Sequence, residues 1–185
     1  IQYIVVLNFY IEKMDYYRLV KYSLKIGELY EQKNDITNAL IYYIDNLNYT
    51  KCDMKCPNKI LHKISILLID INLNESAKYF YEITKINNNN LMSQYSINEY
   101  ILNYLLCKMA IDIIDCEIEL NKFLVFDCSN ECIFIKDLLE NIDNQENFAA
   151  VCFNYAKSKQ FKHFQVSLLL KIKKKIESLE DIDLC

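Results

Sequence analysis

The feature that most limits the folds open to this chain is its shortage of glycine and proline. Among 185 residues there is one glycine, Gly27, and one proline, Pro57. Phosphate-binding loops of the GxGxxG and GxxxxGK types need several glycines, because backbone N–H groups must come close to the phosphate. The sequence therefore argues against nucleotide-binding folds of those types. Turns must be built from asparagine and aspartate, whose side chains hydrogen-bond their own backbone.

Helical periodicity runs through the first half of the chain. Gly27, Tyr30, Ala39 and Tyr43 have the spacing of a tetratricopeptide helical hairpin, in which small residues let two helices approach and aromatic rings fill the groove. A weaker copy repeats the last two positions 38 residues later. Because each helix pair of a stack buries its apolar face against its neighbours, the pattern predicts stacked hairpins over 1–92. Turns are predicted at 34–35, 53–57 and 72–74.

The second half, 93–185, is predicted to form a C-terminal helical bundle with an acidic tail. A long helix is expected from Ser93 or Ser96 to about Phe123, apolar on almost every face, as a helix buried between neighbours is. Shorter helices are expected near 131–141, 145–157 and 161–179. No strand-like alternation persists anywhere. The predicted fold class is all-α, with tetratricopeptide-like stacked hairpins followed by a helical bundle.

Composition favours a cytoplasmic protein with a core of its own. Hydrophobic residues make up 52% of the chain, and a net charge of -4 gives no reason to expect attraction to nucleic acid. No apolar run reaches the roughly 18–20 residues that span a bilayer. The apolar start, 1–7, lacks the basic segment and cleavage site of a signal peptide, so we interpret it as part of a helix that begins upstream. We expect residues 1–10 to self-associate through their exposed apolar surface.

Cysteine and histidine give weak support for a metal centre or an active site. The eight cysteines lie mainly in apolar helical stretches, which favours reduced thiols. Two C-x3-C pairs occur, at 52/56 and 128/132, but structural zinc sites usually use C-x2-C pairs, so zinc is the weaker interpretation. The histidines, His62 and His163, have no nearby serine or cysteine with a convincing orienting acid. We expect no enzyme activity, no cofactor and no metal.

Short motifs, taken in order, resemble one known family. Upstream, 26–43 and the lysines in 58–63 align with it, and most of the motifs lie in the second half. Those are Tyr95-Ser96, Glu99-Tyr100, Leu106-Cys107, Ile111-Asp112, Glu131-Cys132, Leu138-Leu139-Glu140, Leu170-Lys171-Ile172-Lys173-Lys174 and Asp183-Leu184-Cys185. The set resembles the α-type soluble NSF attachment proteins over essentially the whole chain. No single motif is diagnostic; their order and spacing are.

The resemblance implies an adaptor. In such a family several copies wrap a four-helix SNARE bundle and recruit the N-terminal domains of a hexameric NSF-type AAA ATPase, which then disassembles the SNARE complex. It also implies a protein on the cytosolic face of membranes, with membrane contact mainly through an N-terminal region upstream of this sequence. The residues alone leave a second interpretation open, a helical-repeat scaffold that binds peptide termini and has no SNARE specificity.

The resemblance also assigns a basic, SNARE-facing set of residues. Lys21, Lys59 and Lys63 stand at the positions that match the family's SNARE-facing lysines. Lys59 and Lys63 are four residues apart, so they share one helix face. The alternative is that all three are ordinary solvated lysines. Asn98 and Asn130 stand where close relatives carry a basic residue, which predicts weaker electrostatic attraction there.

Two acidic stripes are expected to face the ATPase. On continuous helices the stripes would be Asp112, Asp115 and Glu119, and Glu140, Asp143 and Glu146. Of these, Asp112, Glu140 and Asp143 match family positions that contact the ATPase, and Glu146 is expected to compensate for Asn144, which replaces a family acid. The alternative is again a solvated helix face.

The tail after 179 completes the predicted ATPase-binding set with Asp183 and Leu184. Acids are poorly placed against the negative end of a helix, and a leucine in a polar terminus adds little to a core. Both observations suggest a partner contact, although a frayed end remains the alternative. In the family the tail leucine is tied to stimulating ATP hydrolysis.

Overall fold

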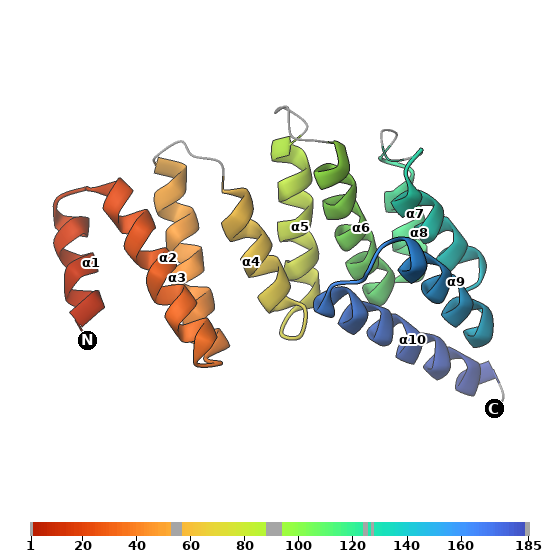
Figure 1. The fold of residues 1–185 in the computed structure, drawn as a ribbon. Coiled ribbons are helices and arrows are strands. Elements are labelled where there is room, and N and C mark those ends of the chain that lie inside the picture. The colour runs from red at the N-terminus through yellow and green to blue at the C-terminus, as the bar shows by residue number, and fades with distance from the viewer. Residues whose placement is uncertain (1, 53–56, 88–93, 124–125, 127, 184–185) are drawn as a thin grey trace. The chain divides into compact units, whose positions relative to one another are not determined.

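The described part of the chain is entirely helical in its regular structure. A computed structural model describes residues 2–52, 57–87, 94–123, 126 and 128–183 (Figure 1). The helices are α1 (Gln2–Glu12), α2 (Tyr16–Gln32), α3 (Ile36–Cys52), α4 (Asn58–Leu68), α5 (Leu73–Asn87), α6 (Gln94–Ile111), α7 (Ile113–Leu120), α8 (Asn130–Glu140), α9 (Gln145–Ser158) and α10 (His163–Asp183). The predicted all-α class of stacked helical hairpins is confirmed. Of these helices, none combines the length and apolar character that crossing a bilayer requires.

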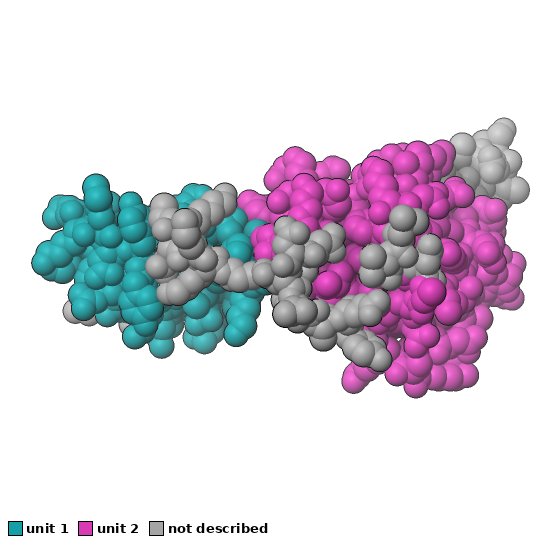
Figure 2. Space-filling model, turned by 90° about the horizontal axis from the view of Figure 1, so that it is seen from above, with its two compact units in different colours: residues 1–68 teal, residues 69–185 magenta. Residues whose placement is uncertain are grey.

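The chain divides into two compact units, residues 1–68 and 69–185 (Figure 2). The first holds α1 to α4 and the second holds α5 to α10. Helix α5, which the sequence assigns to the hairpin region, packs against α6 within the second unit. The predicted division at residue 92 separates hairpins from bundle, and it stays a prediction.

The first unit is built on the α2–α3 hairpin that the sequence spacing predicts. Its turn contains Asn34, whose φ of 58° is left-handed, a conformation that asparagine tolerates better than most residues. The unique glycine explains the tight packing of the two helices. A Cβ on Gly27 would lie 2.5 Å from Cε1 of the fully buried Tyr43 ring. Only glycine lets the ring lie this close to the α2 backbone.

Polar groups also join α2 and α3 inside the first unit. The buried Asn46 side chain on α3 donates to the Ser23 hydroxyl at 2.9 Å and to the Val20 carbonyl on α2. Tyr30 and Tyr42 stack with ring centroids 5.4 Å apart. The hairpin is therefore held by hydrogen bonds as well as by aromatic contacts, which leaves no buried donor on Asn46 unsatisfied.

The second unit is organised around α6. Residues 101–107 of this helix are all buried, as its nearly all-round apolar character predicts. Helices α5, α7, α8 and α10 pack against it. The buried Asn103 side chain on α6 accepts a hydrogen bond from Gln165 on α10 at 2.8 Å, which ties the C-terminal helix to the centre of the unit.

The prediction of one continuous helix from Ser93 or Ser96 to about Phe123 is wrong. The chain leaves the helix at Asp112, which has extended backbone (φ -154°, ψ 125°) and starts α7 as its N-cap. The Asp112 carboxylate accepts from the N–H groups of Ile114 and Asp115, at 2.9 and 3.4 Å. An aspartate in this position satisfies two orphan donors of a new helix, which is favourable enough to interrupt a periodic pattern.

The last helix is longer than predicted. Helix α10 ends at Asp183 rather than near 179, so the acidic segment belongs to its last turn and does not follow it as a tail. Leu184 lies outside the described residues.

Candidate functional site

Two of the three predicted SNARE-facing lysines are exposed on the first unit. Lys21 on α2 and Lys59 on α4 are exposed, and neither forms an ion pair with another described residue. Within the described part of the chain, neither charge is neutralised by a carboxylate. This is the arrangement that an electrostatic docking surface needs, because a charge already paired within the chain adds less to binding.

Lys63 is bound within its own unit. Its ammonium lies 2.9 Å from a carboxylate oxygen of Glu31 and 3.9 Å from Glu28, both on α2. It also donates to the Tyr43 hydroxyl at 3.2 Å and lies 5.2 Å from the centroid of that ring. Although Lys59 and Lys63 share a helix face, the Lys63 head group is held against α2 and α3. Glu31 is 32 residues away in sequence, so local spacing could not reveal this partner.

The same contacts shift the titration of Glu31. Burial alone raises the pKa of its carboxyl, but hydrogen bonds from Tyr43 and Lys63 and the Lys63 charge outweigh burial and lower the pKa below its usual value. Conversely, burial and the hydrogen bond to Glu31 raise the pKa of Tyr43. The cluster therefore holds a carboxylate, an ammonium and a neutral phenol across three helices.

The acids of the first stripe belong to α7 and its N-cap, not to one long helix that includes α6. Asp112 caps α7 and is exposed. Asp115 forms an ion pair with Lys108 at 2.9 Å, and Glu119 forms one with Lys122 at 2.7 Å. The Lys108 partner also lowers the pKa of Asp115. Of the stripe, Asp112 alone keeps a carboxylate without an ion pair to the described residues.

The second set of acids surrounds the α8–α9 turn instead of following one helix. Glu140 is the last residue of α8, Asp143 lies in the turn and Glu146 lies in the first turn of α9. All three are exposed and have no ion pair in the part of the chain that the structure describes. Glu146 is stabilised by the N-terminal end of α9. Three unpaired carboxylates thus occur within one short segment of the surface.

The three asparagines that replace family residues have different surroundings. Asn144 is the N-cap of α9 and accepts the Asn147 N–H at 3.0 Å, so it keeps the capping ability of an aspartate without the charge. Asn98 is 8% exposed, and its side-chain oxygen has no hydrogen-bond partner among described residues. Its side chain is therefore buried here, and the expected loss of positive charge relative to close relatives stays a prediction. Asn130 is exposed at the start of α8.

The tail residues cannot be placed as a site. Asp183 ends α10, and Leu184 is outside the described residues. Their predicted contact with an ATPase stays a prediction.

The cysteines and histidines do not assemble a reactive centre within the described residues. There, no group of three or more histidine, cysteine, aspartate or glutamate side chains is arranged to hold a metal ion. Burial raises the pKa of both Cys107 and Cys116 to about 12, so their thiols stay protonated and unreactive at neutral pH. His163 is exposed at the start of α10.

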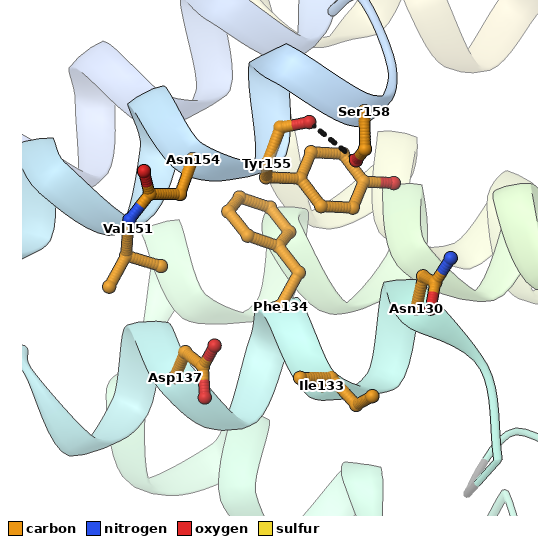
Figure 3. A pocket seen from close by; sticks show the side chains of 8 residues that line it. All are labelled: Asn130, Ile133, Phe134, Asp137, Val151, Asn154, Tyr155 and Ser158. Carbon is orange, nitrogen blue, oxygen red and sulfur yellow. Dashed lines mark hydrogen bonds between the residues drawn. The ribbon is translucent and has the colours of Figure 1, made fainter.

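A groove that the sequence did not reveal lies between α8 and α9. Its volume is about 310 Å³. Figure 3 shows the side chains that line it. Its walls come from residues at helical spacing on each side: Asn130, Ile133, Phe134 and Asp137 on α8, and Val151, Asn154, Tyr155 and Ser158 on α9. The Phe134 and Tyr155 rings stack with centroids 4.1 Å apart. Burial and the nearby carboxylates of Glu131 and Glu99 raise the pKa of Tyr155.

Comparison with known proteins identifies the family. The sequence model of the soluble NSF attachment protein family, SNAP, matches residues 3–177. The chain belongs to this family. The resemblance found in the sequence motifs is thereby confirmed, over the helices of both compact units.

Curated SNAP family members match at low identity. The β-soluble NSF attachment protein of Bos taurus is 26% identical over 167 residues, which covers 85% of this chain and 56% of that protein. The human α-soluble NSF attachment protein is 26% identical over 171 residues, covering 87% and 58%. A probable vesicular-fusion protein sec17 homolog of Schizosaccharomyces pombe is 24% identical over 190 residues, covering 96% and 65%. The chain thus spans little more than half the length of the first two relatives.

Proposed function

We propose that this chain is a non-enzymatic adaptor that binds assembled SNARE complexes and recruits an NSF-type AAA ATPase for their disassembly. The observation that carries the proposal is the SNAP family match across residues 3–177. The names of the relatives, two NSF attachment proteins and a vesicular-fusion protein, support the same role in membrane fusion. Such an adaptor acts on the cytosolic face of membranes as a peripheral protein, and its function needs neither cofactor nor metal.

The SNARE-binding surface in this proposal lies on the first unit. Lys21 and Lys59 supply exposed positive charge, and Lys63 contributes less because Glu31 and Glu28 neutralise it. An exposed ion pair is worth only about 0–1 kcal/mol, so one copy would bind a SNARE bundle weakly. Several copies around one bundle would add their contributions, and binding should weaken as salt screens the charges.

The ATPase-binding surface in this proposal lies on the second unit. Glu140, Asp143 and Glu146 form its centre around the α8–α9 turn, because all three are exposed and unpaired with described residues. Asp112 is a further candidate, since only its capping role uses the carboxylate. Asp183 and Leu184 near the C-terminal end complete the proposed set and act by stimulating ATP hydrolysis.

The SNARE-binding step is tested with a pre-formed four-helix SNARE bundle on beads. The chain should bind at low ionic strength and bind less at physiological ionic strength. The double variant Lys21→Glu plus Lys59→Glu should lose most of the binding. The control is Lys33→Glu plus Lys174→Glu, which changes two other exposed lysines and gives the same net charge.

Equal loss of binding in both double variants would show that net charge, and not this surface, controls association. A folded wild-type chain that does not bind the bundle at low ionic strength would contradict the proposal. That result would favour a helical scaffold with no SNARE specificity.

A further inference from the structure

The groove between α8 and α9 has an apolar floor that remains accessible to solvent. Ile133 on α8 is 52% exposed, and Val151 on α9 is half-buried. Behind them the Phe134 ring is buried and stacks on Tyr155. An aliphatic chain lying on this floor would cover apolar surface that now faces water, which is favourable in proportion to the area removed.

One end of the groove carries an unneutralised negative charge. Figure 3 shows the Asp137 carboxylate on the same side of the groove as Val151, one helical turn beyond Ile133. Asp137 is exposed, and among the described residues its carboxylate has no ion pair and no hydrogen-bond donor. The neighbouring acid Glu131 is already paired, with Lys159 at 3.0 Å. Asp137 therefore supplies the net charge that lines the groove.

The other polar side chains that line the groove are neutral, and the Lys157 ammonium lies at its rim against Asn154. Asn154 on α9 accepts from Lys157 at 3.3 Å, and the Ser158 hydroxyl donates to the Tyr155 carbonyl at 2.8 Å. The Tyr155 hydroxyl is buried and has no hydrogen-bond partner in the described chain. Taken together, the groove combines one open carboxylate, amide groups and stacked aromatic rings around an apolar floor.

We infer that this groove binds an arginine side chain of a partner protein. An arginine combines an apolar stem with a planar cationic head, so its stem lies on Ile133 and Val151 while its guanidinium meets Asp137. The distance suits this arrangement, because one helical turn rises about 5.4 Å, which is within the reach of an arginine side chain. An anionic ligand would be repelled by Asp137, and a purely apolar one would leave the carboxylate partly desolvated and unpaired.

Asp137 and Ile133 are not among the residues assigned above, although the site lies in the same α8–α9 hairpin as the proposed ATPase-binding acids and is lined by Asn130. It goes beyond the proposed function and does not depend on it, because the interaction requires only a partner with an accessible arginine.

The inference is tested on the intact chain by NMR titration with acetyl-arginine-amide. Acetyl-citrulline-amide is the matched probe, since it has nearly the same shape and lacks the charge. The arginine probe should shift the backbone signals of Val151 and of α8 around Ile133, and should bind at least about two- to fivefold more tightly than the citrulline probe. Preference for citrulline, equal binding of both probes, or no shift at these residues would overturn the inference.

Two variants distinguish binding of the probe in the groove from its general electrostatic attraction to an acidic protein. Asp137→Asn keeps the side-chain shape and should reduce the affinity for the arginine probe to that of the citrulline probe. Ile133→Ser should weaken both probes, because it removes the floor. Glu117→Gln is the control, since it removes an exposed acid on α7, outside the groove. If Glu117→Gln weakens binding as much as Asp137→Asn does, the groove is not the site.

Discussion

Replacing Gly27 by alanine should destabilise the chain, although helix propensity alone predicts the opposite. Within a helix, alanine is favoured over glycine by about 1 kcal/mol. At this position the new Cβ would lie 2.5, 2.7 and 3.1 Å from three atoms of the Tyr43 ring. The ring cannot easily move, because it is fully buried and its hydroxyl donates to Glu31 at 2.5 Å.

The size of the effect follows from these opposing contributions. Overpacking of this kind costs about 1–3 kcal/mol, and a shift of the ring that weakens its hydrogen bond to a charged carboxylate adds to that cost. After the gain in propensity is subtracted, Gly27→Ala should lower the free energy of unfolding by roughly 1–2 kcal/mol.

Urea denaturation followed by circular dichroism measures this change. The control is Asn48→Ala, an exposed position on α3 where alanine meets no obstacle and should be neutral or slightly stabilising. In a Tyr43→Leu background the ring is gone, so Gly27→Ala should change sign and stabilise the chain by a few tenths to about 1 kcal/mol. A neutral or stabilising effect of Gly27→Ala in the wild-type background would refute the argument.

Further predictions concern titration, thiol reactivity and capping. The lowered pKa of Glu31 contributes stability at pH values above its unfolded-state pKa, and this contribution is lost as the pH falls through the lower folded-state pKa. Between pH 6 and pH 3, urea melts should therefore show a larger loss in the free energy of unfolding for wild type than for Glu31→Gln. At pH 8 the exposed Cys128 should react with iodoacetamide, while Cys107, with a pKa raised to about 12, should react only after unfolding, as site-resolved mass spectrometry would show. Asn144→Ala should cost about 1 kcal/mol in thermal or urea unfolding, whereas Asn144→Asp should preserve stability and strengthen ATPase binding.

Spacing within one hairpin predicts the close contact of α2 and α3 in the first unit. The small residue at Gly27 and the aromatic at Tyr43 lie on adjacent helices, and their sequence separation is set by helix length and a short turn. The sequence also predicts the burial of α6, because a helix that is apolar on almost every face is typically buried between neighbours. Local pattern and tertiary packing agree in these elements.

Other features depend on a single polar side chain or on tertiary packing, which the sequence pattern does not show. The apolar residues on both sides of Asp112 continue a helical period, yet the carboxylate starts a new helix by accepting two backbone N–H groups. The interaction of Lys63 depends on Glu31, which approaches only when α2 and α4 fold beside α3. Asn98 is polar in sequence but buried in the structure. The α8–α9 groove depends on how two helices pack, which periodicity does not specify.

The central claim, that the chain couples SNARE complexes to an NSF-type ATPase, is tested most directly by a bridging measurement. SNARE bundles on beads are incubated with the ATPase, with and without the chain, and the retained ATPase is quantified. We expect the ATPase to be retained only when the chain is present. Replacing Glu140, Asp143 and Glu146 by their amides or alanine should abolish retention while the chain itself stays bound. Retention of the ATPase that does not depend on the chain, or a bound chain that recruits no ATPase, would contradict the claim.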